Sequence, residues 1–300
     1  MVSSGAKHVL FNAMNAMVDP GDEVIVPTPY WVSYPEFVSL AGGKAVFCRT
    51  GPETEFKLTP EILEATITDK TRVLMLNSPS NPTGAVYSYD ELAALGEVLK
   101  KWDIWVISDD IYSYILYEGE EFCSICQVPG MRERALIVNG VSKTFSMTGW
   151  RIGVAAGPQE LIAAMTRMQD HSTSCPSSVS QWAASYALSE GRELTRNWVD
   201  CLEERRDLAV SSINRIKGLS CRKPLGAFYV FADAREVLSR SSSMNDTLAL
   251  SEYLLMEGGV VVVPGEAFGA PGFLRLSFAT SAENVGEGIA RIASALESLE

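Results

Sequence analysis

The sequence has few histidines and cysteines for its length, and these shortages exclude several classes of site. Its two histidines, His8 and His171, are too few and too far apart for a histidine metal cluster or a strong catalytic-triad hypothesis. Six cysteines are scattered through a chain too large to need disulfides, which favours a reducing compartment. Only Cys123 and Cys126 have CxxC spacing. Because no second pair and no histidine lie nearby, we expect neither a metal nor a redox role for them.

Positive charge and long apolar runs are also scarce. The 25 Lys and Arg residues against 37 Asp and Glu give a net charge of −12, and no local basic patch offsets it. We therefore expect neither nucleic acid nor an anionic membrane as a partner. No apolar run approaches the roughly 20 residues that span a bilayer, and the first residues lack the pattern of a signal peptide. The expected location is the cytoplasm.

What the sequence does contain is a regular alternation of strand and helix patterns. Up to about residue 157, short β-branched runs alternate with amphipathic stretches, which is typical of a mainly parallel α/β sheet with helices on both faces. Strands are predicted at 23–27, 44–48, 72–77, 104–110, 135–140 and 152–157. Helices are predicted at 88–102, 158–170, 177–189 and 193–218.

The pattern changes in the last third of the chain, which predicts a second, smaller α+β domain. Strands are expected at 226–233, 260–265 and 273–279, with helices near 246–257 and 283–298. We place the boundary inside the long helix near residue 200, so that 1–200 form a large domain and 201–300 a small one. The serine-rich stretch 240–246 is expected to be a mobile loop.

Polar groups follow three consecutive strands of the predicted sheet. Asn81 lies in an Asn-Pro-Thr-Gly turn after the third strand, Asp109 and Tyr112 come at the carboxyl end of the fourth, and Lys143 follows the fifth. Taken singly, these residues suit a turn, a helix cap or a surface lysine. Because ligands bind at the carboxyl ends of parallel strands, their conjunction favours a shared site.

A lysine beside an acid and a phenol suits imine chemistry, because desolvation and cationic neighbours lower its pKa toward neutrality. Pyridoxal 5'-phosphate needs such a lysine, an acid against its pyridine nitrogen and a phosphate cradle. Two features could form the cradle. The small-residue turn at 3–10 opens a helix whose free N–H groups attract an anion, and Arg151 can add a forked contact.

Four motifs, SNPTGAVYS, SDDIY, VSKTFSMTGWRIG and FLRLSFATS, resemble in this order the class I pyridoxal-phosphate aminotransferases of the aspartate aminotransferase family, which have fold type I. The resemblance covers essentially the whole chain. GAKHVLFNAM and PTPYWVSYPEFVSLAGG are most similar to the bacterial and plastid branch that uses aspartate and, in some members, prephenate. The resemblance to this family implies a seven-stranded sheet, a homodimer, and transamination of aspartate or glutamate with 2-oxoglutarate or oxaloacetate.

The resemblance also implies roles for individual residues at the cofactor ring. Lys143 would attach the cofactor covalently and carry the proton of the substrate Cα. Asp109 would keep the pyridine nitrogen protonated. Tyr112 and Asn81 would donate hydrogen bonds to the ring's phenolic oxygen, and Trp31 would stack on the ring face. Lys143, Asp109 and Tyr112 are thus the expected catalytic residues.

The remaining roles concern the phosphate and the substrate. The positions that match the phosphate end are Gly5, Ala6, Lys7, Ser142 and Arg151. Arg275 matches the arginine that grips the substrate α-carboxylate. Lys7 matches a lysine that also binds the distal carboxylate, which is the residue-level reason to expect a dicarboxylic substrate. Asn81 and Trp31 are expected to contact the substrate as well.

Chains of this family are usually longer at the amino end, whereas this sequence begins at the phosphate-binding turn. The resemblance therefore implies that the arm clasping the partner subunit and a segment covering the substrate are missing from these 300 residues. We expect weaker cofactor binding and reduced or absent transamination. The alternatives are transamination of alanine, an aromatic amino acid or a kynurenine-type compound, a carbon–sulfur lyase, and a catalytically impaired cofactor-binding fragment or sensor module.

Overall fold

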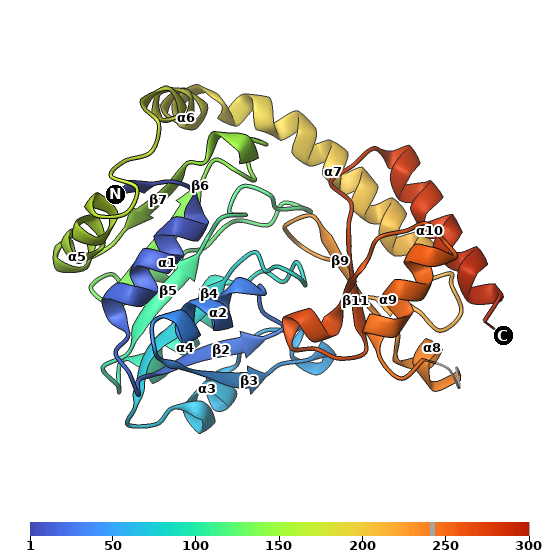
Figure 1. Ribbon diagram of the computed structural model, residues 1–300, viewed down its shortest axis with the longest axis horizontal. Helices are drawn as coiled ribbons and strands as arrows, with labels where there is room; N and C mark the ends of the chain where they lie inside the picture. The colour runs from blue at the N-terminus through green and yellow to red at the C-terminus, as the bar shows by residue number, and fades with distance from the viewer. Residues whose placement is uncertain (241–243, 300) are drawn as a thin grey trace.

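The computed structural model describes residues 1–240 and 244–299 and contains two sheets (Figure 1). The first has seven strands in the order β1-β7-β6-β5-β4-β2-β3. Strands β2 to β6 are parallel, whereas β7 runs antiparallel to both β6 and β1. The strands are β1 (Val2–Ser3), β2 (Glu23–Thr28), β3 (Lys44–Arg49), β4 (Thr71–Asn77), β5 (Trp105–Asp109), β6 (Ala135–Gly140) and β7 (Gly153–Ala156).

Helices cover both faces of this sheet, because its central strands are apolar on both sides. In β4, Val73 and Met75 pack in one core cluster, while Leu74 and Leu76 pack in another. The first cluster includes residues of α1 (Ala6–Met17), α2 (Ser33–Leu40) and α5 (Gln159–Asp170), and the second includes residues of α3 (Pro60–Thr66) and α4 (Tyr89–Leu99). The predicted α/β class is confirmed.

The second sheet has four antiparallel strands in the order β10-β11-β9-β8. Helix α7 runs from the large sheet toward this part (Figure 1) and contributes to its core. The elements are α6 (Ser178–Glu190), α7 (Arg192–Ile213), β8 (Ser220–Cys221), β9 (Tyr229–Asp233), α8 (Arg235–Arg240), α9 (Thr247–Met256), β10 (Val263–Pro264), β11 (Phe273–Ser277) and α10 (Ala282–Glu297). The predicted α+β character is confirmed, and the boundary near residue 200 stays a prediction.

Some predicted ends differ from those observed. Helix α7 ends at Ile213 rather than near Gly218, which instead adopts a φ of 87° in the turn that follows. The strand expected at 260–265 shortens to β10, and β1 was not predicted. Part of the loop expected at 240–246 lies outside the described residues. No helix in the described part of the chain is long and apolar enough to cross a membrane.

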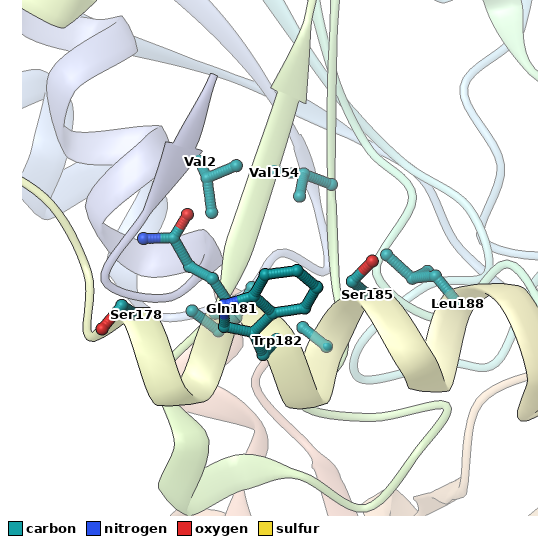
Figure 2. Close-up of a pocket in the computed structure, with 9 residues that line it drawn as sticks. Val2, Val154, Ser178, Gln181, Trp182, Ser185 and Leu188 are labelled. Carbon is teal, nitrogen blue, oxygen red and sulfur yellow. The ribbon is translucent and has the colours of Figure 1, made fainter.

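An open hollow of about 420 Å³ lies between α6 and the edge formed by β1 and β7. Figure 2 shows Val2, Val154, Trp182 and Leu188 around it. Trp182 is 78% exposed, and the residues that line the hollow include no titratable side chain. The hollow is therefore an apolar surface feature rather than a place for acid–base chemistry.

Candidate active site

The carboxyl ends of β4, β5 and β6 lie side by side, with Asn77 in register with Asp109. They open onto a cavity of about 410 Å³ that also receives residues of α1 and the second sheet. Every residue that the sequence placed in the site, except Gly5, lines this cavity: Ala6, Lys7, Trp31, Asn81, Asp109, Tyr112, Ser142, Lys143, Arg151 and Arg275. The strand-end groups therefore meet as expected for parallel strands.

Asp109 is the acid of this cavity. Its side chain is buried, and burial raises the carboxyl pKa to about 6, although two hydrogen bonds and one positive charge act to lower it. The Tyr34 hydroxyl donates to Oδ2 at 2.8 Å, the Ile111 N–H donates to Oδ1 at 3.4 Å, and the Lys143 charge attracts the carboxylate. Asn77 Nδ2 anchors the backbone by donating to the Asp109 carbonyl at 2.7 Å.

The neighbouring Asp110 is buried too but does not line the cavity. It accepts hydrogen bonds from Ser108 Oγ at 2.6 Å and from Ser124 Oγ at 3.4 Å. Burial, with a smaller effect of the Asp109 charge, raises its pKa to about 8. Of the two adjacent acids, Asp109 is the one available to a ligand.

Lys143 supplies the amine. Burial lowers its pKa most, the Arg275 and Arg151 charges add to the effect, and Asp109 opposes it. Its Nζ lies 5.7 Å from the centre of the Tyr112 ring and 5.5 Å from that of Phe228. An amine in this setting loses its proton more readily than a solvated lysine, which favours a nucleophile or a base.

Arg275 reaches the cavity from β11 of the second sheet. Its Nη1 donates to Asn81 Oδ1 at 2.9 Å, and Asn81 is itself fixed by its N–H donating to Asn77 Oδ1 at 2.8 Å. The guanidinium lies over the rings of Tyr229 (4.5 Å) and Phe268 (4.8 Å). Its buried Nε has no hydrogen-bond partner among the described residues. A fixed guanidinium with a spare donor suits an anionic ligand.

The phosphate-end residues fit an anion. Helix α1 begins after Gly5, and no side chain in the described part of the chain caps its first N–H groups. Gly5 has a φ of 91°, and a Cβ there would lie 2.3 Å from Arg151 Nη2. Arg151 Nη1 donates to the Thr148 carbonyl at 2.9 Å. A glycine is thus needed for the guanidinium to approach the helix start, and Ser142 lines the same cavity.

Lys7 and Trp31 lie together at the cavity. Lys7 is exposed, and its Nζ is 4.9 Å from the centre of the half-buried Trp31 ring. Trp31 also meets the Tyr34 ring edge-on, with centroids 5.5 Å apart. The cavity wall therefore offers a cation next to an aromatic face.

Two tyrosines that were not predicted from the sequence also line this cavity, Tyr34 and Tyr229. Tyr34 donates to Asp109, and the hydroxyls of Tyr229 and Tyr112 are 2.8 Å apart. Tyr34 lies three residues after Trp31, a helical spacing that could have signalled a shared face. Tyr229 comes from the second sheet, and no local pattern links it to Tyr112.

The set of groups therefore fits pyridoxal 5'-phosphate. The cavity combines a buried acid, a desolvated lysine and an anion cradle, together with a guanidinium whose Nε has no hydrogen-bond partner in the described part of the chain. Elsewhere, Cys123 Sγ donates to Gln127 Oε1 and Cys126 Sγ donates to Ser124 Oγ. No cluster of three potential metal ligands occurs within residues 1–240 and 244–299.

Comparison with known proteins gives consistent matches. The family model described as aminotransferase class I and II matches residues 1–292. An aspartate/prephenate aminotransferase of Cereibacter sphaeroides is 49% identical over 297 residues, which cover 97% of this chain and 74% of that relative. The crystal structure of the aspartate aminotransferase from Rhizobium meliloti superposes with a TM-score of 0.96 at 46% identity, covering 100% of this chain and 76% of that one. The crystal structure of an aromatic aminotransferase from Pyrococcus horikoshii superposes with a TM-score of 0.94 at 39% identity. The match covers 99% of this chain and 79% of that one.

Proposed function

The chain belongs to the class I and II aminotransferases, and from this premise we propose that it transfers the amino group of aspartate or glutamate to 2-oxoglutarate or oxaloacetate with pyridoxal 5'-phosphate. The observation that carries the proposal is the convergence of Lys143, Asp109 and Arg275 on one cavity. Lys143 would supply an amine, Asp109 a partner for the ring nitrogen, and Arg275 a guanidinium that binds a carboxylate. The three residues come from three separate segments of the chain.

The cofactor would be held at its ring nitrogen, its phenolic oxygen, one ring face and its phosphate. Asp109 would face the ring nitrogen, Tyr112 and Asn81 would donate hydrogen bonds to the phenolic oxygen, and Trp31 would cover a ring face. The N–H groups after Gly5 and the Arg151 guanidinium would bind the phosphate, with Ser142 beside them. When bound, the cofactor supplies a carbonyl that links reversibly to amines and a ring that accepts electrons.

The substrate would be oriented by charge. Arg275 would bind the α-carboxylate in a forked pair, since Asn81 and two aromatic rings hold the guanidinium in place. Lys7 would bind the distal carboxylate of a dicarboxylic substrate. Lys143, whose lowered pKa favours the neutral amine, would take the proton from the substrate Cα and later return a proton.

Aromatic amino acids are a second candidate class of substrate. The observation that favours them is the ring of Trp31 beside Lys7, which could contact an apolar ring as well as a carboxylate. Similarity to the aromatic aminotransferase from Pyrococcus horikoshii also supports aromatic substrates.

An amino-transfer assay with the purified chain and added cofactor tests the proposal. Product formation from aspartate and 2-oxoglutarate is compared with that from tyrosine and from alanine, with Lys143→Ala as the inactive control. We expect the largest kcat/KM for aspartate. A larger kcat/KM for tyrosine would transfer the proposal to aromatic substrates. The absence of transfer from every amino acid would contradict an active aminotransferase and would favour the alternative of a catalytically impaired cofactor-binding fragment.

We further propose that the chain forms a homodimer in the cytoplasm. Four large apolar side chains of α6, namely Val179, Trp182, Tyr186 and Leu188, are exposed in the single chain, which supports an interface at this helix. Analytical ultracentrifugation tests self-association directly. A monomer at micromolar concentration would contradict the dimer.

A further inference from the structure

We propose that Tyr34 is a positioning residue that keeps the Asp109 carboxylate ionised and in one orientation for the ring nitrogen of the cofactor. This inference rests on the proposed function and assigns a further residue to it. Tyr34 would act through Asp109 and not on the substrate.

The geometry is that of a buried, directed hydrogen bond. The Tyr34 hydroxyl donates to Asp109 Oδ2 at 2.8 Å, and the two side chains are only 3% and 5% exposed. Among the described residues, the other hydrogen bond to this carboxylate comes from the Ile111 N–H at 3.4 Å, which is longer and weaker. Tyr34 therefore supplies the better of the two donors.

The tyrosine is itself fixed by its element. It lies in the first turn of α2, a helix that packs in the same core cluster as β4 and β5. Its ring meets Trp31 edge-on with centroids 5.5 Å apart. Because Tyr34 is held by packing, its hydroxyl can fix a partner carboxylate 75 positions further along the chain.

The charges around Asp109 show why the donor matters. Burial is the main force that favours its protonated form, and the hydrogen bond from Tyr34 is the largest opposing effect. The Lys143 charge adds a smaller opposing effect. The Tyr112 hydroxyl is also close enough for the Asp109 charge to raise the pKa of Tyr112. Asp110 adds negative charge beside it only as it ionises, at about pH 8. Loss of the hydroxyl should therefore raise the Asp109 pKa above about 6 and leave more of the acid protonated near neutral pH.

A double-mutant cycle on cofactor binding tests this role. The dissociation constant of pyridoxal 5'-phosphate is measured for wild type, Tyr34→Phe, Asp109→Asn and the double variant across pH 5.5 to 8.5. In the wild-type background we expect Tyr34→Phe to weaken binding by about tenfold near pH 7, as for loss of a hydrogen bond to a charged group. In the Asp109→Asn background we expect an effect below about twofold.

The pH dependence provides a second readout. We expect the midpoint below which binding weakens to lie higher in Tyr34→Phe than in wild type. The matched control is Tyr87→Phe, which removes another fully buried hydroxyl, one that accepts the Leu58 N–H at 2.6 Å and does not line the cavity. This control should leave both the affinity and the midpoint unchanged.

The outcomes separate the two proposals. An equal loss in both backgrounds, with an unchanged midpoint, would overturn the role of Tyr34 and leave the proposed function intact. Failure of the wild-type protein to bind the cofactor would overturn the proposed function itself. If Tyr34→Phe does not fold, difluorotyrosine can be incorporated at position 34 instead. This residue keeps nearly the same side-chain size and makes the hydroxyl a stronger hydrogen-bond donor to Asp109. It should lower the midpoint, and an unchanged midpoint would again contradict the role.

Discussion

Two adjacent carboxyl groups, Asp109 and Asp110, illustrate how environment separates the roles of identical side chains. Both are buried, but Asp109 faces the cavity with Tyr34 as its donor, whereas Asp110 is enclosed by the hydroxyls of Ser108 and Ser124. Their pKa values are about 6 and about 8. Near neutral pH, Asp109 is therefore the acid that is largely charged.

Replacement of Asp110 by Asn should remove a pH dependence of stability. Folding raises the pKa of Asp110 from 3.8 to about 8, so between these values the folded protein binds a proton that the unfolded chain has released. Stability from this group is therefore present at low pH and lost as pH rises toward 8. A difference of one bound proton changes stability by about 1.4 kcal/mol per pH unit, so we expect the unfolding free energy of Asp110→Asn to rise by about 3–4 kcal/mol relative to that of wild type from pH 5 to pH 8.

Urea unfolding at several pH values measures this difference. The exposed Asp103→Asn serves as the control and should follow wild type. Parallel stability curves for wild type and Asp110→Asn would contradict the raised pKa.

Arg275→Lys tests the carboxylate contact. A lysine cannot form the forked pair or keep the planar stacking over Tyr229, so we expect kcat/KM for aspartate to fall about 10- to 100-fold. Steady-state kinetics with the holoenzyme provide the measurement. Arg222→Lys, an exposed residue paired with Glu55, is the control. Equal kinetics in both variants would remove Arg275 from the substrate site.

Individual site residues could be predicted where they follow strands. Asn81, Asp109 and Lys143 were found because the carboxyl ends of parallel strands share an edge. Tyr34 and Tyr229 were not predicted. Their roles depend on how a covering helix and a second sheet pack against that edge, which local patterns do not specify.

Among the elements, the start of α1 and the turn at Arg151 form one unit. Gly5 precedes the helix with a φ of 91°, and Arg151 adopts a φ of 53°, so both backbones are in the left-handed region. Gly153 completes the contact, since a Cβ there would lie 2.2 Å from the Ala6 nitrogen. The helix start and the guanidinium are brought together by small residues.

Gly5→Ala should disrupt this unit. The added Cβ would lie 2.3 Å from Arg151 Nη2 and would also be strained at positive φ. We expect the affinity for pyridoxal 5'-phosphate to fall about tenfold or more, because a contact to the charged phosphate is lost. The affinity for pyridoxal, which has no phosphate, should change little.

Gly21→Ala is a matched control for this prediction. Gly21 has a φ of 99°, but no atom lies within 4 Å of its added Cβ. It should share the backbone strain without the loss of phosphate affinity. A similar loss for both cofactor forms in Gly5→Ala would place the defect in folding rather than in the cradle.

The sequence predicted those elements whose patterns are long and regular. Strands β2 to β7 were recognised because their apolar runs are bounded by turns, and α4 because a serine cap signal precedes apolar residues at three-to-four spacing. In the structure, Ser88 and Glu91 form a capping box at the start of this helix. Strand β1 has only two residues and pairs at the sheet edge, so its sequence carries no periodic signal. Elements of this length depend on tertiary pairing.

In the whole molecule, α7 connects the two sheets, and Arg206 ties the helix to its surroundings. The side chain is completely buried and lies over the Tyr117 ring at 4.7 Å. It donates to the Pro224 carbonyl and to the carboxylates of Glu118 and Glu203. One guanidinium thus joins a loop of the large sheet, α7 and the segment leading into β9.

Arg206→Lys should destabilise the protein. A single ammonium cannot satisfy these acceptors in the same geometry, so we expect a loss of about 2–4 kcal/mol in unfolding free energy. Chemical denaturation measures it, with Arg291→Lys as the control. Arg291 pairs with Glu287 on the surface and is 52% exposed, so that change should cost less than about 0.5 kcal/mol. Equal stability of the two variants would show that Arg206 does not secure the helix.

We propose that both sheets together form a transamination site, with Lys143 and Asp109 from one sheet and Arg275 from the other. The most direct test is the absorption spectrum of the purified chain with pyridoxal 5'-phosphate, before and after addition of aspartate, beside Lys143→Ala. We expect a visible band that depends on Lys143 and that aspartate converts to the spectrum of the pyridoxamine form. A band unaffected by Lys143→Ala, or the absence of any band, would contradict it.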